Sequence, residues 1–309
     1  MKKLIGILIL TLTLVNTPSA FAAKSIQNTK CTDLHYFKVD AKMKYECVKK
    51  NGKLVWNSYK PLSTPNSKTF PWWNSMLQVR SFNETPKTIQ QVTYFPSPNV
   101  PDSEMQKFYA VFGDVVKYWS QFYVNPQPII VTVITEKDHD WFINKWTELG
   151  KDDTGQGWWD RTGEGEGGAV GWNDQHQIHM YFKIISNKPN TVATRGYVFH
   201  EVTHFFQFTA IGRNIQNGPC WFDEGQADYV QAAQSAANAA DAFPIALQSR
   251  YDERFLINKY FNFKPTADGL YKILSEEVSG SKLCIDETPY FGYTMGSLVS
   301  EKIVIDFGW

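Results

Sequence analysis

The sequence predicts an α+β protein in which a small β-hairpin precedes a larger domain of mixed sheet and helices. The segment YECVKKNGKLVWNSY shows strand patterns on both sides of Asn51-Gly52, the strongest short-range pattern for a hairpin. Between about residue 91 and residue 182, strand and helix patterns alternate along the chain. From about residue 191 onward the pattern is mostly helical. Together these regions favour a small mixed sheet followed by a helical part.

Composition limits the classes of partner. The 309 residues include 31 basic and 31 acidic side chains, so the formal net charge is zero. This balance gives no reason to expect nucleic acid or an anionic membrane as partner. With 43% hydrophobic and 15% aromatic residues, the chain can bury a sizeable core, as one large domain or two smaller ones.

Residues 1–23 have the three parts of a bacterial secretory signal peptide. MKK supplies the positive start, LIGILILTLTLV the apolar stretch, and PSAFAA a small-x-small cleavage site. The apolar run is too short to span a bilayer comfortably, and no cysteine immediately follows the cleavage site, so a lipid anchor there is not expected. We therefore expect a secreted, extracellular protein with no integral membrane segment after the signal is removed.

Four cysteines in an exported chain suggest two disulfides, although three pairings are formally open. Local pairs are the most economical, and we expect Cys31–Cys47 and Cys220–Cys284. Zinc binding by these cysteines is the alternative, but no C-x-x-C spacing supports it.

Residues 24–60 are predicted to form the hairpin module. Its Y-x-C-x-x-x-x-G-K-L-V-W pattern resembles small cysteine-containing modules of secreted bacterial proteins, which implies a stabilising or cell-wall-associating role. Residues 61–90 begin PLSTPNSKTFPWWNS, rich in Pro, Ser and Asn, and are predicted to be a linker. Residues 91–309 then form the main domain.

The main domain begins with a strand in TIQQVTYF and a helix whose N-cap is expected at Asp102 or Ser103. The β-branched run PIIVTVIT fits a buried strand, and DHDWFINKWTELG a helix closed by Gly150. GEGEGGAVGW is predicted to be a loop. HQIHMYF alternates, which predicts a strand with one apolar and one polar face.

The segment YVFHEVTHFFQF combines a helical pattern with metal-binding chemistry. His200 and His204 are four residues apart, so on a helix they lie on one face and can bind one metal ion. Glu201 is rotated by about 100° around the axis, from where its carboxylate can face the metal without binding it. This is the H-E-x-x-H arrangement of two zinc ligands and a general base. The helix also has a core-facing stripe: Val198, Val202 and Phe205.

The segment WFDEGQADYV supplies a third ligand. Glu224 follows His204 by 20 residues, at the start of another helical pattern, and two His with one Glu is a known catalytic zinc set. Asp228 lies one turn after Glu224 and could accept the free ring N–H of a ligand histidine. The alternatives are that the histidines are hydrogen-bonded core residues that bind no metal, and that Asp228 is a solvated helix carboxylate.

HEVTH followed by WFDEGQAD resembles the gluzincin metallopeptidases, the superfamily of thermolysin and the aminopeptidase-N-like enzymes. The resemblance covers roughly residues 168–309 and implies a zincin-like domain with one Zn²⁺ ion. It implies that His200, His204 and Glu224 bind the zinc, that Glu201 is the base, and that Asp228 orients the first histidine.

YFGYTMGSLVSEKI resembles the stretch in aminopeptidase-like gluzincins whose tyrosine hydroxyl stabilises the oxyanion. Tyr293 matches that tyrosine and Tyr290 is the second candidate; the alternative is that Tyr293 is a core or helix-start tyrosine. GGAVGWNDQHQIHMYF resembles the loop and edge strand along the substrate cleft, where a peptide can pair by β-augmentation. His179 is then a candidate substrate contact, or an ordinary surface histidine.

The chain departs from the aminopeptidase pattern in one respect: GAVGW lacks the acid that captures a free amine. This favours an endopeptidase acting on peptides or proteins. The helical part after Tyr293 is short for the superfamily, which favours an incomplete sequence. The rival hypotheses are a non-catalytic wall- or matrix-associated binding protein on a gluzincin fold, and a purely structural zinc site.

Overall fold

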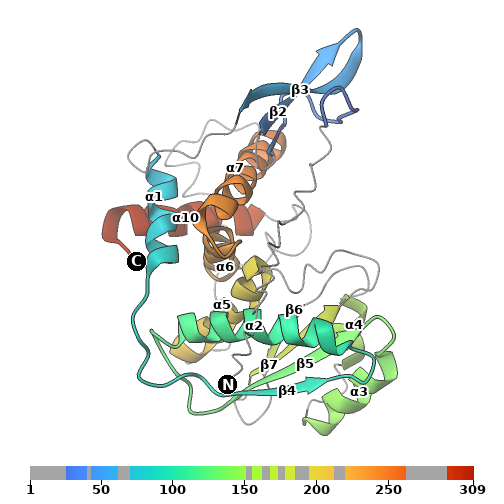
Figure 1. Cartoon of the computed structure of the whole chain (residues 1–309), viewed down its shortest axis with the longest axis vertical. Helices are drawn as coiled ribbons and strands as arrows, with labels where there is room; N and C mark the ends of the chain where they lie inside the picture. The colour runs from blue at the N-terminus through green and yellow to red at the C-terminus, as the bar shows by residue number, and fades with distance from the viewer. Residues whose placement is uncertain are drawn as a thin grey trace, which may run out of the picture.

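The structure, a computed structural model, describes residues 26–39, 43–61, 70–150, 155–161, 168–172, 178–184, 195–211, 220–261 and 291–309. A three-stranded sheet and a four-stranded sheet lie at opposite ends of the molecule, and helices α1, α6, α7 and α10 lie between them (Figure 1). Within these ranges the helices are α1 (Pro71–Ser81), α2 (Asp102–Trp119), α3 (His139–Glu148), α4 (Gly155–Arg161), α5 (Arg195–Ile211), α6 (Cys220–Gln234), α7 (Ala239–Phe261) and α10 (Phe291–Phe307). The α+β class is confirmed. The predicted signal peptide, residues 1–23, lies outside the described residues.

The first sheet is the predicted hairpin with one added strand. β2 (Met43–Lys50) and β3 (Lys53–Pro61) pair antiparallel, and β1 (Phe37–Val39) pairs with β2 at the edge. Asn51 and Gly52 form the connecting turn with φ values of 51° and 77°. Both angles are positive, as a two-residue hairpin turn of the primed type requires, and Asn and Gly adopt them at low cost.

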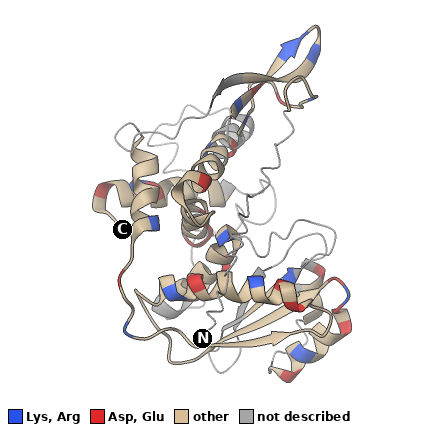
Figure 2. Cartoon of the chain, viewed as in Figure 1, with Lys and Arg blue, Asp and Glu red and all other residues tan. Residues whose placement is uncertain are grey.

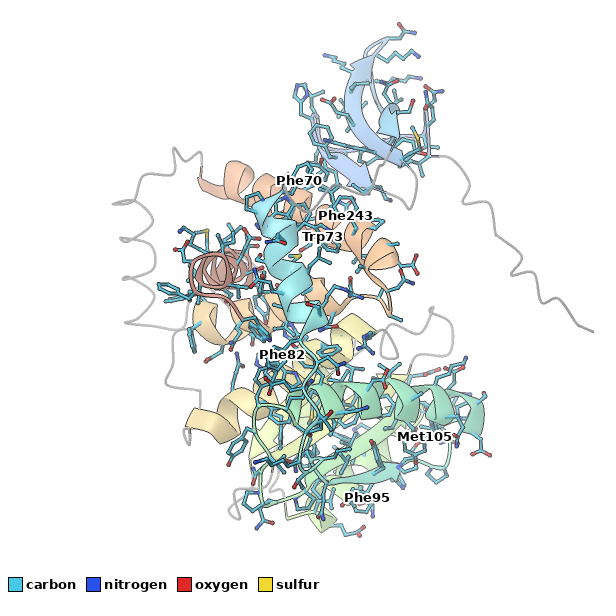
Figure 3. All side chains as sticks on the ribbon, turned by 60° about the vertical axis from the view of Figure 1, so that its left-hand side comes forward. Phe70, Trp73, Phe82, Phe95, Met105 and Phe243 are labelled. Atoms are coloured by element: carbon cyan, nitrogen blue, oxygen red, sulfur yellow. A yellow bond between two sulfur atoms is a disulfide. The ribbon has the colours of Figure 1, made fainter. Side chains whose placement is uncertain are left out.

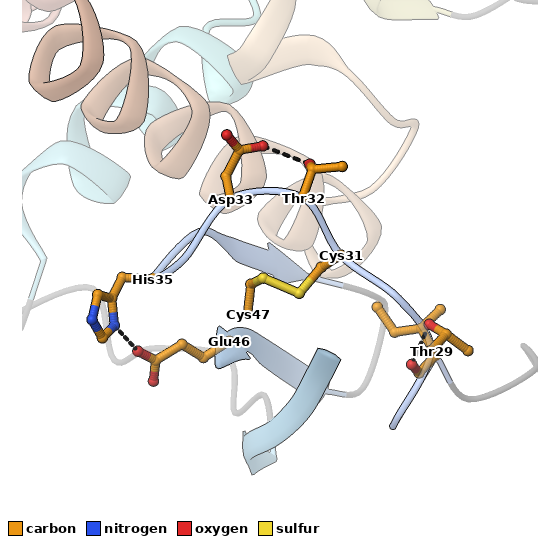
Figure 4. Close-up of a disulfide and its surroundings, with 8 residues drawn as sticks. Thr29, Cys31, Thr32, Asp33, His35, Glu46 and Cys47 are labelled. Carbon is orange, nitrogen blue, oxygen red and sulfur yellow. Dashed lines mark hydrogen bonds and ion pairs between the residues drawn. A yellow bond between two sulfur atoms is a disulfide. The ribbon is translucent and has the colours of Figure 1, made fainter. Parts of the chain in front are cut away.

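The predicted disulfide Cys31–Cys47 is confirmed (Figure 4), with the two Cα atoms 6.0 Å apart. Both cysteines are buried together with Tyr45 and Trp56, and these side chains form a small core of their own. Such a module has little apolar area to bury, so a covalent cross-link is an effective stabiliser. For the predicted pair Cys220–Cys284, the side chain of Cys220 and the whole of Cys284 lie outside the described residues.

The hairpin module is attached to α7. The Tyr36 hydroxyl donates a hydrogen bond to Asp252, and Gln248 binds the backbone of β1 through both ends of its amide. Its Oε1 accepts from the Val39 N–H at 2.6 Å, and its Nε2 donates to the Phe37 carbonyl oxygen at 3.2 Å. A side-chain amide therefore satisfies the edge of this sheet as a neighbouring strand would.

The second sheet has the strand order β4-β5-β7-β6: β4 (Val92–Pro96), β5 (Ile129–Thr135), β7 (Ile178–Ile184) and β6 (Gly168–Trp172). The first three strands are parallel, and β6 pairs antiparallel with β7 at the edge. GEGEGGAVGW was expected to be a loop, and this is wrong for residues 168–172. The ladder to β7 supplies the backbone pairing that a short-range pattern does not reveal.

The expectation of one polar face on β7 is also wrong. Phe182 packs on Phe108 of α2 on one side of the sheet, whereas Tyr181 packs on Phe142 and Trp146 of α3 on the other. Helices thus cover both faces, and even Lys183 is only 4% exposed. Sheets with parallel strands are commonly buried in this way.

Residues 61–90, expected to be a linker, contain α1, where the structure differs from the prediction. Pro71 begins the helix, as a proline can because its missing N–H has no partner in the first turn. Trp73, Met76 and Val79 are buried in the main core, and Trp73 meets Phe243 of α7 with ring centroids 5.1 Å apart (Figure 3).

The predicted start of α2 is wrong, whereas the predicted end of α3 is confirmed. The N-cap of α2 is Pro101, with Asp102 already helical, so the prediction of Asp102 or Ser103 is wrong by one or two residues. Gly150 follows α3 with a φ of 76°, which confirms it as the residue that closes the helix.

Charged residues of both signs are interspersed over the described helices and strands (Figure 2), in keeping with the balanced composition. None of the helices in the described ranges is long and apolar enough to span a bilayer.

A buried carboxylate stabilises the carboxyl end of β5. Asp138 is 1% exposed and accepts hydrogen bonds from the Thr135 N–H at 2.6 Å, the Thr135 hydroxyl at 2.7 Å and the Asn99 amide at 2.6 Å. The Ser97 hydroxyl donates a fourth. Burial alone would raise the pKa of Asp138, but these donors hold it below its ordinary value of 3.8.

The Asp138→Asn variant should lower the free energy of unfolding at pH 7 by about 2–3 kcal/mol, because the new amide directs N–H groups at donors. A carboxyl whose folded-state pKa is depressed stabilises the fold above its unfolded value and loses that contribution as the pH falls. The difference from wild type should therefore shrink below about pH 4. Urea unfolding at pH 7 and pH 3 measures it, with the exposed Asp140→Asn as control. A difference independent of pH would contradict this account.

Candidate metal centre

From Val198 to Gln207, helix α5 is buried on every side, which fixes the direction of its polar side chains. The predicted stripe of Val198, Val202 and Phe205 is at most 1% exposed. Phe199 and Phe206 are also buried and pack against rings of α2. A helix that is apolar all round belongs to a core. The polar side chains on α5 are therefore held by packing and must find partners inside the protein.

Three predicted ligand atoms converge between α5 and α6. His200 Nε2, His204 Nε2 and Glu224 Oε2 form a triangle with sides of 3.2 Å each. A tetrahedral ion with bonds of about 2.0–2.1 Å separates its ligands by about 3.3–3.4 Å. The triangle therefore has the dimensions of one face of such a coordination sphere. These three residues could hold a metal ion.

The second ring nitrogen of each histidine also has a partner. His200 Nδ1 lies 3.1 Å from Asp228 Oδ1, within ion-pair distance although not aligned as a full hydrogen bond. His204 Nδ1 lies 2.9 Å from Gln207 Oε1. Burial alone would lower the pKa of both histidines, but Asp228 and Glu224 raise the pKa of His200, and Glu224 raises that of His204.

Glu201 lies in the same buried environment without joining the triangle of ligand atoms. Burial raises the pKa of its carboxyl to about 7, and the two neighbouring histidines partly offset that rise. The pKa of Glu224 moves in the opposite direction: burial would raise it, but His204 and His200 hold it well below its usual range. Two glutamates in one site thus differ in proton affinity, which suits one for exchanging a proton and the other for binding a cation.

Tyr293 comes into the site from α10. Its ring lies parallel to that of His200, with centroids 6.1 Å apart and an interplanar angle of 10°. Burial raises the pKa of the Tyr293 hydroxyl, and so do the nearby carboxylates, including a hydrogen bond to Glu224. A neutral hydroxyl beside the ligand triangle is a hydrogen-bond donor at any physiological pH.

The structure does not place the side chains of two other predicted site residues, Tyr290 and His179. Tyr290 lies outside the described residues. The backbone of His179 lies in β7, paired with Ile130 on one side and Gly171 on the other, so it is not on the edge strand. Its side chain lies outside the described residues. The edge position belongs to β6, whose backbone contacts α5.

A close helix crossing explains how Tyr293 reaches Glu224. A Cβ atom on Gly225 would lie 2.1 Å from the Gly296 Cα, and one on Gly296 would lie 1.6 Å from the Trp221 carbonyl oxygen. The backbones of α6 and α10 therefore touch directly. Glu224 precedes one of these glycines, and Tyr293 lies one turn before the other.

Sequence reasoning missed Gln207 and Gln226. Gln207 is 6% exposed, and its Nε2 donates to the Asp223 carbonyl oxygen at 3.0 Å and to Gln226 Oε1 at 2.8 Å. The spacing of three residues after His204 put Gln207 on the same side of α5, and this was the one observation in the sequence that could have identified it.

Comparison with known families bears on the same region. Residues 162–262 match the family model BSP, described as a peptidase of plants and bacteria. The match includes the three candidate ligand residues, Glu201 and Asp228, and ends before Tyr293. No curated protein matches the chain. The family description supports a hydrolase that acts on peptides.

The Gly296→Ala variant should lower the free energy of unfolding by about 3 kcal/mol, because the added methyl group overlaps backbone atoms that cannot move independently. The control is Gly113→Ala on the exposed side of α2, where an added Cβ has open space. That variant should be neutral or more stable by up to about 1 kcal/mol. Equal denaturation midpoints for the two variants would show that the helices do not cross as described.

Proposed function

We propose that the chain is a secreted zinc-dependent metallopeptidase with a zincin-like domain of the gluzincin type. The observation that supports it most is the triangle of 3.2 Å formed by two imidazole nitrogens and one carboxylate oxygen. Two His and one Glu leave a fourth coordination position open, which distinguishes a catalytic zinc set from closed structural sites. The match to a peptidase family over the same residues supports the reaction class.

In this proposal His200, His204 and Glu224 hold one zinc ion. When bound, zinc polarises the scissile carbonyl and brings the pKa of a water molecule to about 7. Asp228 holds the first ligand histidine through its other ring nitrogen, 3.1 Å away. The buried, mostly apolar surroundings of α5 keep these side chains from other conformations.

Glu201 acts as the general base and then as the acid. Its carboxylate takes a proton from the attacking water and gives it to the amine that leaves. A carboxyl with a pKa raised to about 7 by burial can perform both transfers near neutral pH. Tyr293 donates a hydrogen bond to the oxyanion that forms on the carbonyl. For this step the Tyr293 hydroxyl must leave its hydrogen bond with Glu224 and donate to the oxyanion.

We favour an endopeptidase acting on peptides or proteins over an aminopeptidase. The strand β6 (Gly168–Trp172) lies at the edge of its sheet and contacts α5, so an extended peptide could pair with it beside the site. Its sequence GAVGW has no acidic side chain to capture a free N-terminal amine.

The proposed arrangement of the chain is a signal peptide (1–23), the hairpin module (24–60), a connecting segment (61–90) that includes α1, and the peptidase domain (91–309). Secretion agrees with the Cys31–Cys47 disulfide, which persists in oxidising environments. The hairpin module would stabilise the protein or bind the cell wall.

Purified mature protein should contain about one zinc per chain and hydrolyse a casein-type substrate. The Glu201→Gln variant should keep the metal and lose hydrolysis, because this carboxylate is not a ligand. The control is Glu148→Gln, an exposed carboxylate of α3 that should leave both unchanged. Zinc in every form with no hydrolysis by wild type would favour the rival binding protein. Absence of metal from wild type would mean that the histidines are core residues.

The Tyr293→Phe variant should retain metal and lower kcat by about 10²–10³, the usual cost of one oxyanion donor. Because phenylalanine keeps the ring beside His200, packing should change little. Steady-state kinetics with metal analysis of the same sample would measure both quantities. Unchanged kcat would assign the tyrosine to packing alone.

A further inference from the structure

Gln207 on α5 is a buried amide whose hydrogen-bonding capacity is used at both ends. Its Oε1 lies 2.9 Å from His204 Nδ1, and its Nε2 lies 3.0 Å from the Asp223 carbonyl oxygen and 2.8 Å from Gln226 Oε1. Both acceptors belong to α6. The amide therefore joins a ligand histidine of one helix to the backbone and a side chain of the other.

The orientation of this amide follows from its partners. A backbone carbonyl oxygen can only accept a hydrogen bond, so the group that faces Asp223 O must be the NH₂ of Gln207. The opposite orientation would bring two carbonyl oxygens together at a side chain that is only 6% exposed, which is unfavourable. Hence the oxygen of Gln207 faces the imidazole.

The oxygen of Gln207 in turn fixes the tautomer of His204. An amide oxygen only accepts, so Nδ1 of His204 must carry the hydrogen. In the neutral ring the lone pair then lies on Nε2, the atom that points into the ligand triangle. The corresponding nitrogen of His200, Nδ1, lies 3.1 Å from a carboxylate oxygen of Asp228. One histidine thus has a neutral amide beside its Nδ1, and the other has a carboxylate.

We propose that Gln207 is a positioning residue that holds His204 in its metal-binding tautomer and orientation, with Gln226 and the Asp223 carbonyl fixing Gln207 itself. This inference rests on the proposed metal site. A neutral amide suits this position because Glu201, Glu224 and Asp228 already contribute carboxyl groups to the buried cluster. A further carboxylate would add like-charge repulsion and another desolvation cost.

The test is zinc affinity of the full chain after removal of metal, measured by competition with a chromophoric chelator. Gln207→Met keeps the size of the side chain and removes its hydrogen bonds. Its zinc affinity should fall by about 10- to 100-fold, as for other outer partners of ligand histidines. Gln226→Met, at a partly exposed position, should give a smaller loss. The matched control is Gln234→Met, which removes a buried glutamine of the same helix α6 whose amide binds Val79 and not the site.

Nitrogen-15 NMR of the histidine rings in the metal-free chain gives a second readout that a merely structural role would not change. At a pH high enough for the imidazole to be neutral, His204 of wild type should show a protonated Nδ1 and a bare Nε2, and in Gln207→Met a mixture of tautomers. Wild-type zinc affinity together with an unchanged tautomer in the Gln207 variant would overturn the inference. If Gln207→Met fails to fold, Gln226→Met decides by the same two measurements. If wild type binds no zinc, the proposed function fails, and the tautomer of His204 still tests the role of Gln207.

Discussion

The architecture depends on burying two imidazoles and a carboxylate in an apolar core. Transfer of such groups out of water costs several kcal/mol unless each polar atom finds a partner. His200 and His204 supply four ring nitrogens; within α5, Gln207 contacts one of them and the two Nε2 atoms contact each other. The other partners come from α6, which contributes Glu224 and Asp228 one turn apart. The packing of α5 against α6 therefore supplies partners for buried polar atoms as well as apolar contacts.

The same requirement explains the close approach of α10. The Tyr293 hydroxyl contacts Glu224 from a helix that lies nearer to α6 than ordinary side chains permit. Glycines at 225 and 296 remove the Cβ atoms at the crossing, and backbone then meets backbone. Glycine costs about 1 kcal/mol in a helix interior, so its presence in both helices at one point is informative. The cost is offset by the position it gives Tyr293.

A feature could be predicted from the sequence when the residues that determine it are close together along the chain. The H-E-x-x-H spacing, the Asn51-Gly52 turn and the Cys31–Cys47 pair depend on neighbours along the chain, and the structure brings those residues together as expected. The buried second face of β7 depends on α3, about 40 residues earlier, and alternation alone could not reveal it. Residues 71–81 had a linker-like composition around them, whereas the burial of Trp73 depends on α7. Gln207 was overlooked because an amide gains a role only from acceptors on another helix.

At two places in the structure, a glutamine holds a neighbouring group in position next to a carboxylate. Gln207 joins His204 to α6 next to Glu224, and Gln248 joins β1 to α7 next to Asp252, whose carboxylate it also contacts at 2.8 Å. An amide offers an acceptor and two donors in one plane and adds no charge. A lysine or a glutamate could supply only half of these bonds and would change the electrostatics of its carboxylate neighbour. Fixed orientation without added charge suits both a buried histidine of the candidate metal centre and the edge of a sheet, and one residue type provides it at each place.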